Sequence, residues 1–465
     1  MVTRHTSFPP DEVFICQLAR LGDLAQTLPL IRALNRIRTL ELLCDTAAAP
    51  WGELLPGIAR VRTLDSRAWR RRSAGDLAGF PSLLATLDRD PAAARCRGRF
   101  LALNDHPVAD AVAAVACRED AGSWMTGRLV LIRSYVRLVA RDRRLNRLHL
   151  ADLWASLAGA PRLCPLEPVP APPSGTQFAK TVLERLSSGK SGGIWTFILG
   201  SGANCRRLDP EIFAGWWREI PPEVRPAAVL AGGRGEEELA ARFRRAAGSS
   251  AGLLDLTGRC SPAELLGIFA ASRRVIGVDT GPLHWAAAVG TKVVGMYFAE
   301  AGLHDTGPYG EGHWALAPDC PEYPCAPARA TACGRRCREA FADPRKMARL
   351  LANLEADTPA AAPGLVLHRS RWTPAGNGWE KVTDGMEDPA AAAFARLARR
   401  VLGLDSSPAL PQEPETARAA DRWRAAWSDL AGRFPRPAAV PEKVMEQARR
   451  DAVQRLQAVA PAPAC

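Results

Sequence analysis

A short polar turn between two apolar segments carries the residue types best suited to chemistry. Asp279, Thr280, Gly281 and His284 stand in the stretch DTGPLH, directly after a β-branched run at 275–278 that is typical of a buried strand. Thr280 is a good N-cap, and the proline that follows suits a first helical turn, so we predict that a helix begins here. The open N–H groups of such a helix favour an anion such as a pyrophosphate, although an ordinary capped turn is the alternative.

The elements that would position this turn are apolar runs ending in glycine or small polar residues. Strands are expected at 12–18, 40–44, 194–200 and 227–233, with a helix at 24–38. Alternating strands and helices predict an α/β protein with parallel sheets. Ligands bind in such sheets beyond the carboxyl ends of the strands, which is where the polar turn stands.

A proline-rich stretch predicts how the chain is divided. The segment PLEPVPAPPSG at 165–175 has the composition of an extended linker. We therefore expect one domain over residues 1–165 and a second over 176–357. Residues 365–465 are charged and interrupted by prolines, and they are predicted to form a helical extension whose role no motif indicates.

Charge and composition limit the class of protein. The net charge of +12 suits nucleic acid, an anionic membrane surface or a phosphorylated substrate. No RNA-binding or zinc-finger motif accompanies the arginines, so nucleic acid is not expected. The sequence has no signal-peptide core and no apolar run of spanning length, and eight of its twelve cysteines are scattered, which predicts a cytoplasmic protein.

The other four cysteines form a C-x4-C-x7-C-x3-C pattern made of Cys320, Cys325, Cys333 and Cys337. Four thiolates this close could bind a structural zinc or iron ion. The spacings are looser than in a pair of CxxC motifs, however, so we favour free thiols or a redox-labile pair.

Four stretches together resemble glycosyltransferase family 9, the family of the lipopolysaccharide heptosyltransferases. They are QLARLGDLAQTLPLIRAL at 17–34, LGSGANCRRLDPEIFAGWW at 199–217, AGGRGEEELA at 231–240, and the run from LTGRCSPAELL to KVVGMYF at 256–298. Their order and spacing extend over roughly residues 12–357. The resemblance implies a GT-B architecture with two Rossmann-like domains facing a cleft, the first for the acceptor and the second for the nucleotide-sugar.

Asp23 matches the position of the catalytic base in this family. Inversion at an anomeric carbon needs a group that takes the proton from the acceptor hydroxyl, and a carboxylate can do so. From the sequence alone, capping of a helix explains Asp23 equally well, since Gln26 follows three residues later.

The resemblance also implies a donor site. Its diphosphate signature is matched by Asp279, Thr280, Gly281 and His284, and its phosphate loop by Ser201, Gly202 and either Arg206 or Arg207. Glu236 falls where the family approaches the nucleoside, or it is an acid that stabilises a helix start. No DxD motif is evident, so no cofactor is expected to be required for catalysis.

An arginine cluster in the first domain, Arg67, Arg70 and Arg71, is where the family would meet a phosphorylated or acidic lipid-linked glycan acceptor. A solvated charged face is the alternative. Contact with the inner membrane surface would then be peripheral.

The expected function is inverting, metal-independent transfer of a heptose or related sugar from an ADP-sugar to a lipopolysaccharide core acceptor. One alternative keeps the fold but transfers the sugar to a protein hydroxyl and uses the four cysteines as a metal site. The other is a binding or scaffold protein that retains the fold without activity.

Overall fold

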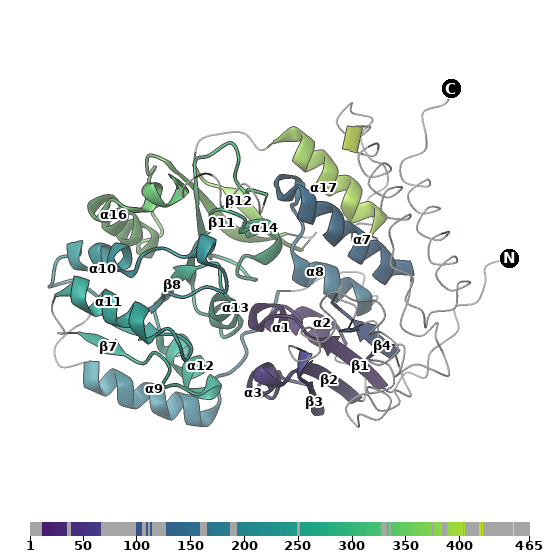
Figure 1. Cartoon of the computed structure of the whole chain (residues 1–465), viewed down its shortest axis with the longest axis horizontal. Helices are drawn as coiled ribbons and strands as arrows, with labels where there is room; N and C mark the ends of the chain where they lie inside the picture. Colours follow the sequence, from purple (N-terminus) through teal and green to yellow (C-terminus); the bar gives the residue numbers. More distant parts are fainter. Residues whose placement is uncertain are drawn as a thin grey trace. The chain divides into compact units, whose positions relative to one another are not determined.

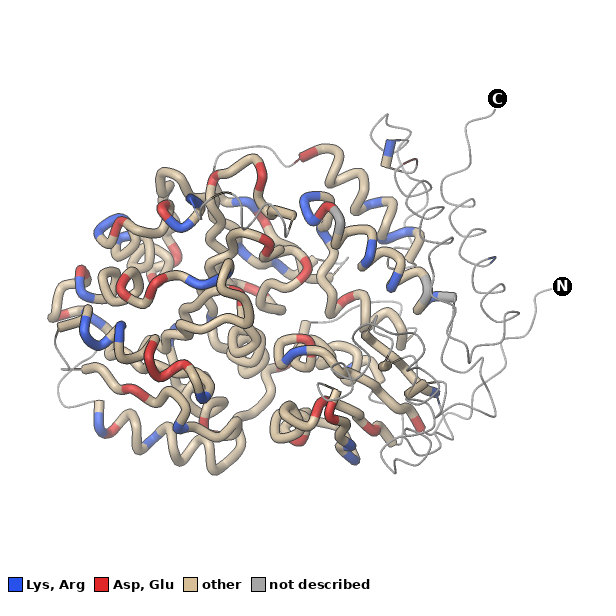
Figure 2. The backbone as a smooth tube through the Cα atoms, viewed as in Figure 1, with Lys and Arg blue, Asp and Glu red and all other residues tan. Residues whose placement is uncertain are grey.

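The structure is a computed structural model of the chain (Figure 1). It describes residues 12–34, 39–66, 99–104, 108–109, 112–113, 127–158, 165–186, 193–248, 252–326, 333, 336–373, 376–383, 388–402, 404, 418–419, 421 and 450. Acidic and basic positions are interspersed along the described chain (Figure 2).

The chain forms two compact units, and neither unit is one continuous stretch of sequence. Unit 1 comprises Met1–Ala140, Ala151–Leu163 and Ala392–Cys465, and unit 2 comprises Arg141–Leu150 and Cys164–Ala391. The proline-rich stretch at 165–175 stands at the start of the long segment of unit 2. A separate segment of ten residues, 141–150, lies earlier in the sequence and also belongs to unit 2.

Unit 1 contains a four-stranded parallel sheet in the order β3-β2-β1-β4. Its strands are β1 Glu12–Gln17, β2 Thr39–Asp45, β3 Arg60–Leu64 and β4 Arg99–Ala102. Phe14 of β1 stacks on Phe100 of β4 with ring centroids 5.1 Å apart, which fixes one side of this sheet by aromatic packing.

The helix expected at 24–38 is two short helices, α1 Leu21–Ala25 and α2 Leu28–Ala33. Pro29 explains the break, because proline has no N–H group to donate to the carbonyl of Ala25, the last residue of α1. The break leaves α1 as a single turn directly after β1.

The other helices of unit 1 come from distant parts of the sequence. They include all or most of α3 Ala49–Gly52, α7 Gly127–Arg141, α8 Leu150–Ala155 and α17 Pro389–Val401. Helix α17 lies alongside α7, where Phe394 stacks on Tyr135 at 6.1 Å (Figure 1). Among the helices that the structure describes, none is both long and apolar enough to cross a bilayer.

Unit 2 contains an eight-stranded sheet in the order β12-β11-β10-β9-β8-β5-β6-β7. The strands are β5 Ile194–Ile198, β6 Ala227–Ala231, β7 Leu253–Asp255, β8 Arg274–Val278, β9 Val293–Met296, β10 Trp314–Pro318, β11 Leu365–Thr373 and β12 Gly376–Lys381. Strands β5 to β10 are parallel, whereas β11 pairs antiparallel with both of its neighbours. The expected strands after residue 190 are therefore present, and their carboxyl ends share one edge.

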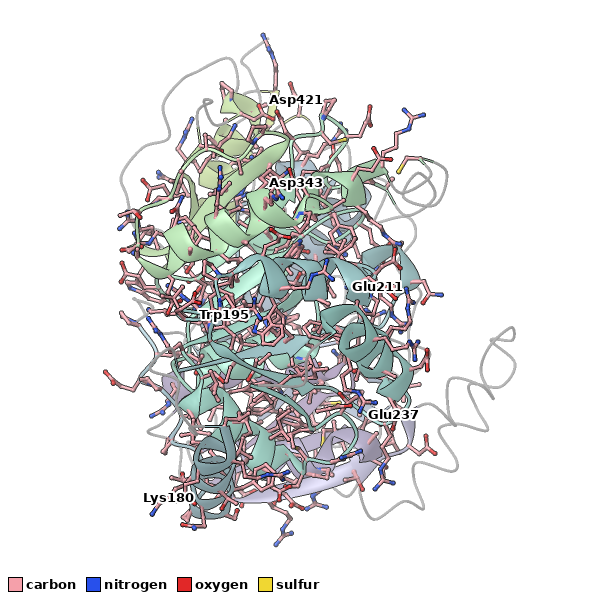
Figure 3. All side chains as sticks on the ribbon, turned by 90° about the vertical axis from the view of Figure 1, so that its left-hand side faces the viewer. Lys180, Trp195, Glu211, Glu237, Asp343 and Asp421 are labelled. Atoms are coloured by element: carbon pink, nitrogen blue, oxygen red, sulfur yellow. The ribbon has the colours of Figure 1, made fainter. Side chains whose placement is uncertain are left out.

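The helices that pack on this sheet are α9 Pro173–Leu186, α10 Pro210–Glu219, α11 Glu237–Ala247, α12 Pro262–Ala271, α13 Gly281–Ala288, α14 Leu303–Thr306 and α16 Pro344–Glu355. Trp195 lies inside the unit, on β5, and Glu211 and Glu237 lie in the first turns of α10 and α11 (Figure 3). Helices α9 and α12 approach closely at glycines, since a Cβ on Gly175 would lie 2.0 Å from the carbonyl oxygen of Ala263.

The helical extension predicted over 365–465 is not confirmed, because residues 365–381 form β11 and β12 at the edge of the unit 2 sheet. Leu365 and Leu367 are buried while Val366 and His368 are partly exposed, which is the period-two alternation of a strand. The sequence predicted a helix over residues 365–381 because the alternation of apolar and polar residues there covers only a few positions. The helix α17 does follow, at Pro389–Val401.

Candidate functional site

The DTGPLH turn forms the predicted strand, turn and helix in unit 2. Strand β8 ends at Val278 and α13 begins at Gly281. Thr280 takes the N-cap position with extended backbone angles, φ −159° and ψ 157°, but its side chain makes no capping hydrogen bond. The N–H groups at the start of α13 are therefore not capped by that side chain, which is the geometry that anion-binding helices use.

Asp279 is held beside this helix start by the loop that follows β5. The Nη1 atom of Arg206 lies 2.5 Å from Oδ2 of Asp279, and both side chains are largely buried. The hydroxyl of Ser201 donates to the carbonyl oxygen of Asp279 at 3.0 Å. Two loops far apart in sequence thus meet at one point.

The structure distinguishes the two candidate arginines. Arg206 reaches the Asp279 carboxylate, whereas Nε of Arg207 donates to the backbone oxygen of Ser201 at 2.8 Å. Gly202 is exposed, and a Cβ there would lie 3.8 Å from Nη2 of Arg206. Arg206 is therefore the arginine whose charge faces the helix start.

His284 lies in the first turns of α13 with 8% of its surface exposed. Burial lowers the pKa of its imidazole to about 4, so the ring is neutral at pH 7. Its Nδ1 atom is buried and has no hydrogen-bond partner within the described protein. A neutral ring of this kind can offer a hydrogen bond to a ligand without bringing a charge.

Glu236 is the N-cap residue of α11 and folds back over the ends of two strands. Its Oε2 atom accepts a hydrogen bond from the N–H of Gly233 at 3.1 Å. Burial raises the pKa of this carboxyl, and the Gly233 hydrogen bond opposes part of that effect. A Cβ on Gly200 or Gly232 would lie 1.8 or 2.3 Å from the carboxylate oxygens, so the position of this side chain depends on both glycines.

Asp23 lies in unit 1, and it is inside α1 rather than before it. The N-cap residue is Arg20, and the Oδ2 atom of Asp23 accepts the N–H of Arg20 at 3.0 Å. Gln26 is the C-cap residue and is buried, so the expected pairing of Asp23 with Gln26 is wrong. The carboxylate is half-buried, directly after the carboxyl end of β1.

The acceptor arginines Arg67, Arg70 and Arg71 lie outside the described residues. Their role stays a prediction.

The four clustered cysteines carry free thiols that are partly buried. The pKa of Cys325 rises to about 11, chiefly because of burial and then because of the charges of Cys320, Cys333 and Cys337. Within the described part of the chain, no three His, Cys, Asp or Glu side chains are gathered closely enough to hold a metal ion.

Two contacts of the loop that follows β5 were not predicted from the sequence. Glu300, which follows β9, has its Oε1 atom 3.9 Å from Nε of Arg206. Arg338 is buried and donates from Nη2 to the backbone oxygen of Asn204 at 2.5 Å. No local pattern marks either residue, since each meets a loop about a hundred positions away.

Comparison with known proteins shows a match to one protein family. The model of glycosyltransferase family 9 (heptosyltransferase) matches residues 223–332. No curated protein sequence matches the chain.

Among solved structures, the E. coli ADP-heptose lipopolysaccharide heptosyltransferase II is 14% identical and covers 74% of this chain and 99% of its own, with a TM-score of 0.51. A family 9 glycosyltransferase from Veillonella parvula is 15% identical, with coverages of 64% and 83% and a TM-score of 0.49. The E. coli heptosyltransferase WaaC with ADP is 18% identical, with coverages of 64% and 91% and a TM-score of 0.44.

The parallel strands of the two units and the structural match with a TM-score of 0.51 define a fold of the GT-B type, and the family 9 match to residues 223–332 supports a glycosyltransferase. The resemblance to family 9 is confirmed over residues 223–332, which contain Glu236 and the whole DTGPLH turn.

Proposed function

We propose that this glycosyltransferase moves a heptose or a related sugar from an ADP-sugar to a lipopolysaccharide core acceptor, with inversion and without a metal. The observation that carries the proposal is the geometry at the start of α13. The side chain of Thr280 does not cap this helix, and Arg206 and His284 lie close to it. The family 9 match to residues 223–332 supports a heptosyltransferase-like donor. The relative with a TM-score of 0.51 is an ADP-heptose lipopolysaccharide heptosyltransferase.

In this proposal the diphosphate of the donor binds at the start of α13. Its oxygens accept hydrogen bonds from the N–H groups there, beginning with Gly281, and from the ring of His284. Arg206, which pairs with Asp279 in the structure, would share its charge between that carboxylate and the phosphates. The nucleoside would lie toward Glu236, beyond the ends of β5 and β6.

The transfer step needs one base and a stabilised leaving group. The acceptor hydroxyl oxygen attacks the anomeric carbon on the face opposite the diphosphate, and its proton passes to the carboxylate of Asp23. The bond from the anomeric carbon to the diphosphate oxygen breaks, and its electron pair leaves with ADP. Helix α13 and Arg206 stabilise that departing negative charge without moving, because fixed dipoles and charges already point at it.

A panel of nucleotide-sugars scored by thermal shift tests the donor assignment, because a ligand that binds the native state raises the unfolding temperature. We expect ADP-heptose to stabilise the protein and UDP-glucose to leave it unchanged. An Asp279→Asn variant should lose the ADP-heptose response. Stabilisation by UDP-glucose alone would contradict the proposal.

The acceptor and the location of the enzyme belong to the same proposal. Arg67, Arg70 and Arg71 would bind acidic groups of a lipid-linked glycan, and the protein would work in the cytoplasm, at the inner membrane surface. Intact-mass analysis of the reaction products distinguishes this from a protein acceptor. A sugar found on protein and absent from lipid would overturn the lipopolysaccharide acceptor.

A structural zinc or iron at the four cysteines is a separate proposal, and we assign it no part in the reaction. Metal analysis of purified protein tests it. About one ion per chain, lost on Cys325→Ser, would support the site. Protein purified anaerobically without bound metal would contradict it.

A further inference from the structure

Unit 2 contains a pocket lined by both polar and apolar side chains, and the residues proposed for donor binding do not line it. Its volume is about 530 Å³, within the range of small-molecule sites. The floor comes from the last three strands of the sheet, through Ala317 and Pro318 of β10, His368 of β11, and Trp379 and Lys381 of β12.

This pocket stands at the same sheet edge as the DTGPLH turn but over other strands. The donor candidates follow β5, β6 and β8, whereas the pocket lies over β10, β11 and β12. None of the donor candidates is among the residues that line it. The two sites are therefore distinct parts of one edge.

The segment 141–150 builds one wall and holds the loop that forms the next. Arg143 donates from Nη1 to the backbone oxygen of Glu300 at 3.0 Å, and Nε2 of His149 lies 2.8 Å from the oxygen of Gly307. Gly307 in turn makes room for the indole, since a Cβ there would lie 2.4 Å from Cζ2 of Trp379. These contacts therefore join the segments that form the walls of the pocket.

Three bases that line the pocket, Arg143, Arg147 and Lys381, are partly buried, and the fourth, Arg144, is exposed. Lys381 lies directly across the strand pair from His368, and Lys381 and Arg147 both lower the pKa of His368, after the larger effect of burial. Three acids at the pocket, Asp319, Glu380 and Asp388, are exposed.

The remaining acid of the lining is already balanced. Asp305 lies 3.5 Å from Nη1 of Arg143. Charged donors, carboxylate acceptors and an aromatic ring together suit a ligand rich in hydroxyl groups, because each hydroxyl both donates and accepts while the ring faces stay apolar. The partly buried bases add a preference for one negative group on that ligand.

We propose that this pocket is a binding subsite for an acidic sugar, separate from the donor site. The carboxylate of the sugar faces Lys381 and Arg147, and its ring packs against Trp379. The subsite does not depend on the proposed transfer reaction, so it can be tested by binding alone.

The test is a ligand-observed NMR titration of the full chain with D-glucuronate, with D-glucose and inorganic phosphate as comparison ligands. We expect D-glucuronate to bind at least about tenfold more tightly than either, since each lacks one half of the recognised chemistry. Equal binding of glucose would overturn the acidic preference, and equal binding of phosphate would overturn the sugar. No binding of D-glucuronate would overturn the subsite.

Variants locate the binding. Lys381→Met should weaken D-glucuronate binding at least about tenfold. Lys180→Met is the matched control, because Lys180 is exposed on α9, away from the pocket lining (Figure 3). Equal weakening in both variants, or none in Lys381→Met, would overturn the placement.

Two further arms separate this inference from the proposed function and identify the source of the sugar. Saturating ADP should leave D-glucuronate binding unchanged, and competition would show that the site is not separate. An oligosaccharide ending in glucuronate that binds at least about tenfold more tightly than the monosaccharide identifies the source as a glycan, and equal affinity identifies it as a free sugar acid. Loss of ADP binding with intact glucuronate binding would count against the proposed function alone.

Discussion

Three helix starts in this molecule treat their N–H groups in different ways. In unit 1, the carboxylate of Asp23 accepts the N–H of Arg20 at the start of α1. In unit 2, the carboxylate of Glu236 accepts the N–H of Gly233, which precedes α11, while no side chain caps α11 itself. At α13 the Thr280 side chain makes no such bond, and the nearby carboxylate of Asp279 is turned to Arg206.

The difference shows where each start can still bind a ligand. A carboxylate of the same chain that lies beside a helix start already interacts with the positive end of that helix. The N–H groups at the start of α13 remain able to bind an anionic group of a ligand. A helix start that its own chain occupies and one that is open to a ligand therefore differ in what the nearest carboxylate contacts.

The substitution with the largest expected effect is Asp23→Asn, which separates the capping of α1 from the proposed catalysis. An amide oxygen can still accept the Arg20 N–H, so α1 keeps its cap, but the amide cannot take a proton. We expect sugar transfer to fall about 10²- to 10⁴-fold while ADP affinity measured by calorimetry is unchanged.

The matched control for that change is Asp343→Asn. Asp343 caps α16 by accepting the N–H groups of Arg345 and Lys346, each at 3.0 Å, and it is exposed (Figure 3). If Asp343→Asn lowered transfer as much as Asp23→Asn, the loss would come from capping and not from chemistry.

Arg206→Gln tests the open start of α13 directly. Removing the guanidinium takes away one charged contact to the diphosphate, so ADP affinity should fall about 10- to 100-fold by calorimetry. Arg242→Gln is the control, because Arg242 pairs with Glu211 on the surface at 2.7 Å. Unchanged ADP affinity in Arg206→Gln would mean that this arginine serves Asp279 alone.

Gly277→Ala tests whether the fold sets the position of α13. A Cβ there would lie 2.7 Å from the backbone oxygen of Ile198 and 3.3 Å from Cδ2 of Leu283. We expect a loss of about 1–3 kcal/mol in the free energy of unfolding in denaturant. Gly233→Ala, where a Cβ meets no atom within 4 Å, should change it by about 0.5 kcal/mol or less. Equal losses would show that packing at Gly277 is not special.

The smallest effect concerns pH and the α11 start. Because burial raises the pKa of Glu236 in the folded state above its ordinary value of 4.5, the folded protein binds this proton more tightly than the unfolded chain. Stability should therefore decrease as pH rises from 4.5 through the raised folded pKa, and it should be constant above it with respect to this group. Glu236→Gln should remove that part of the slope in thermal unfolding at several pH values. An unchanged slope would show that Glu236 ionises as freely in the folded state as in the unfolded one.

The strand, turn and helix around DTGPLH in unit 2 were predictable because their signals are local. The β-branched run of β8, the small residues after it and the proline of DTGPLH all lie within ten positions. Asp279 and His284 became candidates for the same reason, and their role in donor binding stays a prediction.

The partners of those residues were not predictable. That Arg206 rather than Arg207 meets Asp279 depends on how the loop after β5 turns, and this involves residues 73 positions apart. Asp23 was expected to pair with Gln26, but the helix begins at Leu21 and places Gln26 at its other end. Strands β11 and β12 were missed because their half-exposed alternation is weak.

The way the chain is shared between the units limits how this enzyme can be cut for study. A fragment that begins at Cys164 would omit residues 141–150 and with them Arg143 and His149, the two side chains that fasten the loop at Glu300 and Gly307. A fragment that stops at Leu163 would leave α7 without Phe394. Expression of separate halves should thus yield incomplete proteins, and cleavage sites are better introduced in pairs, so that each segment remains with the unit it completes.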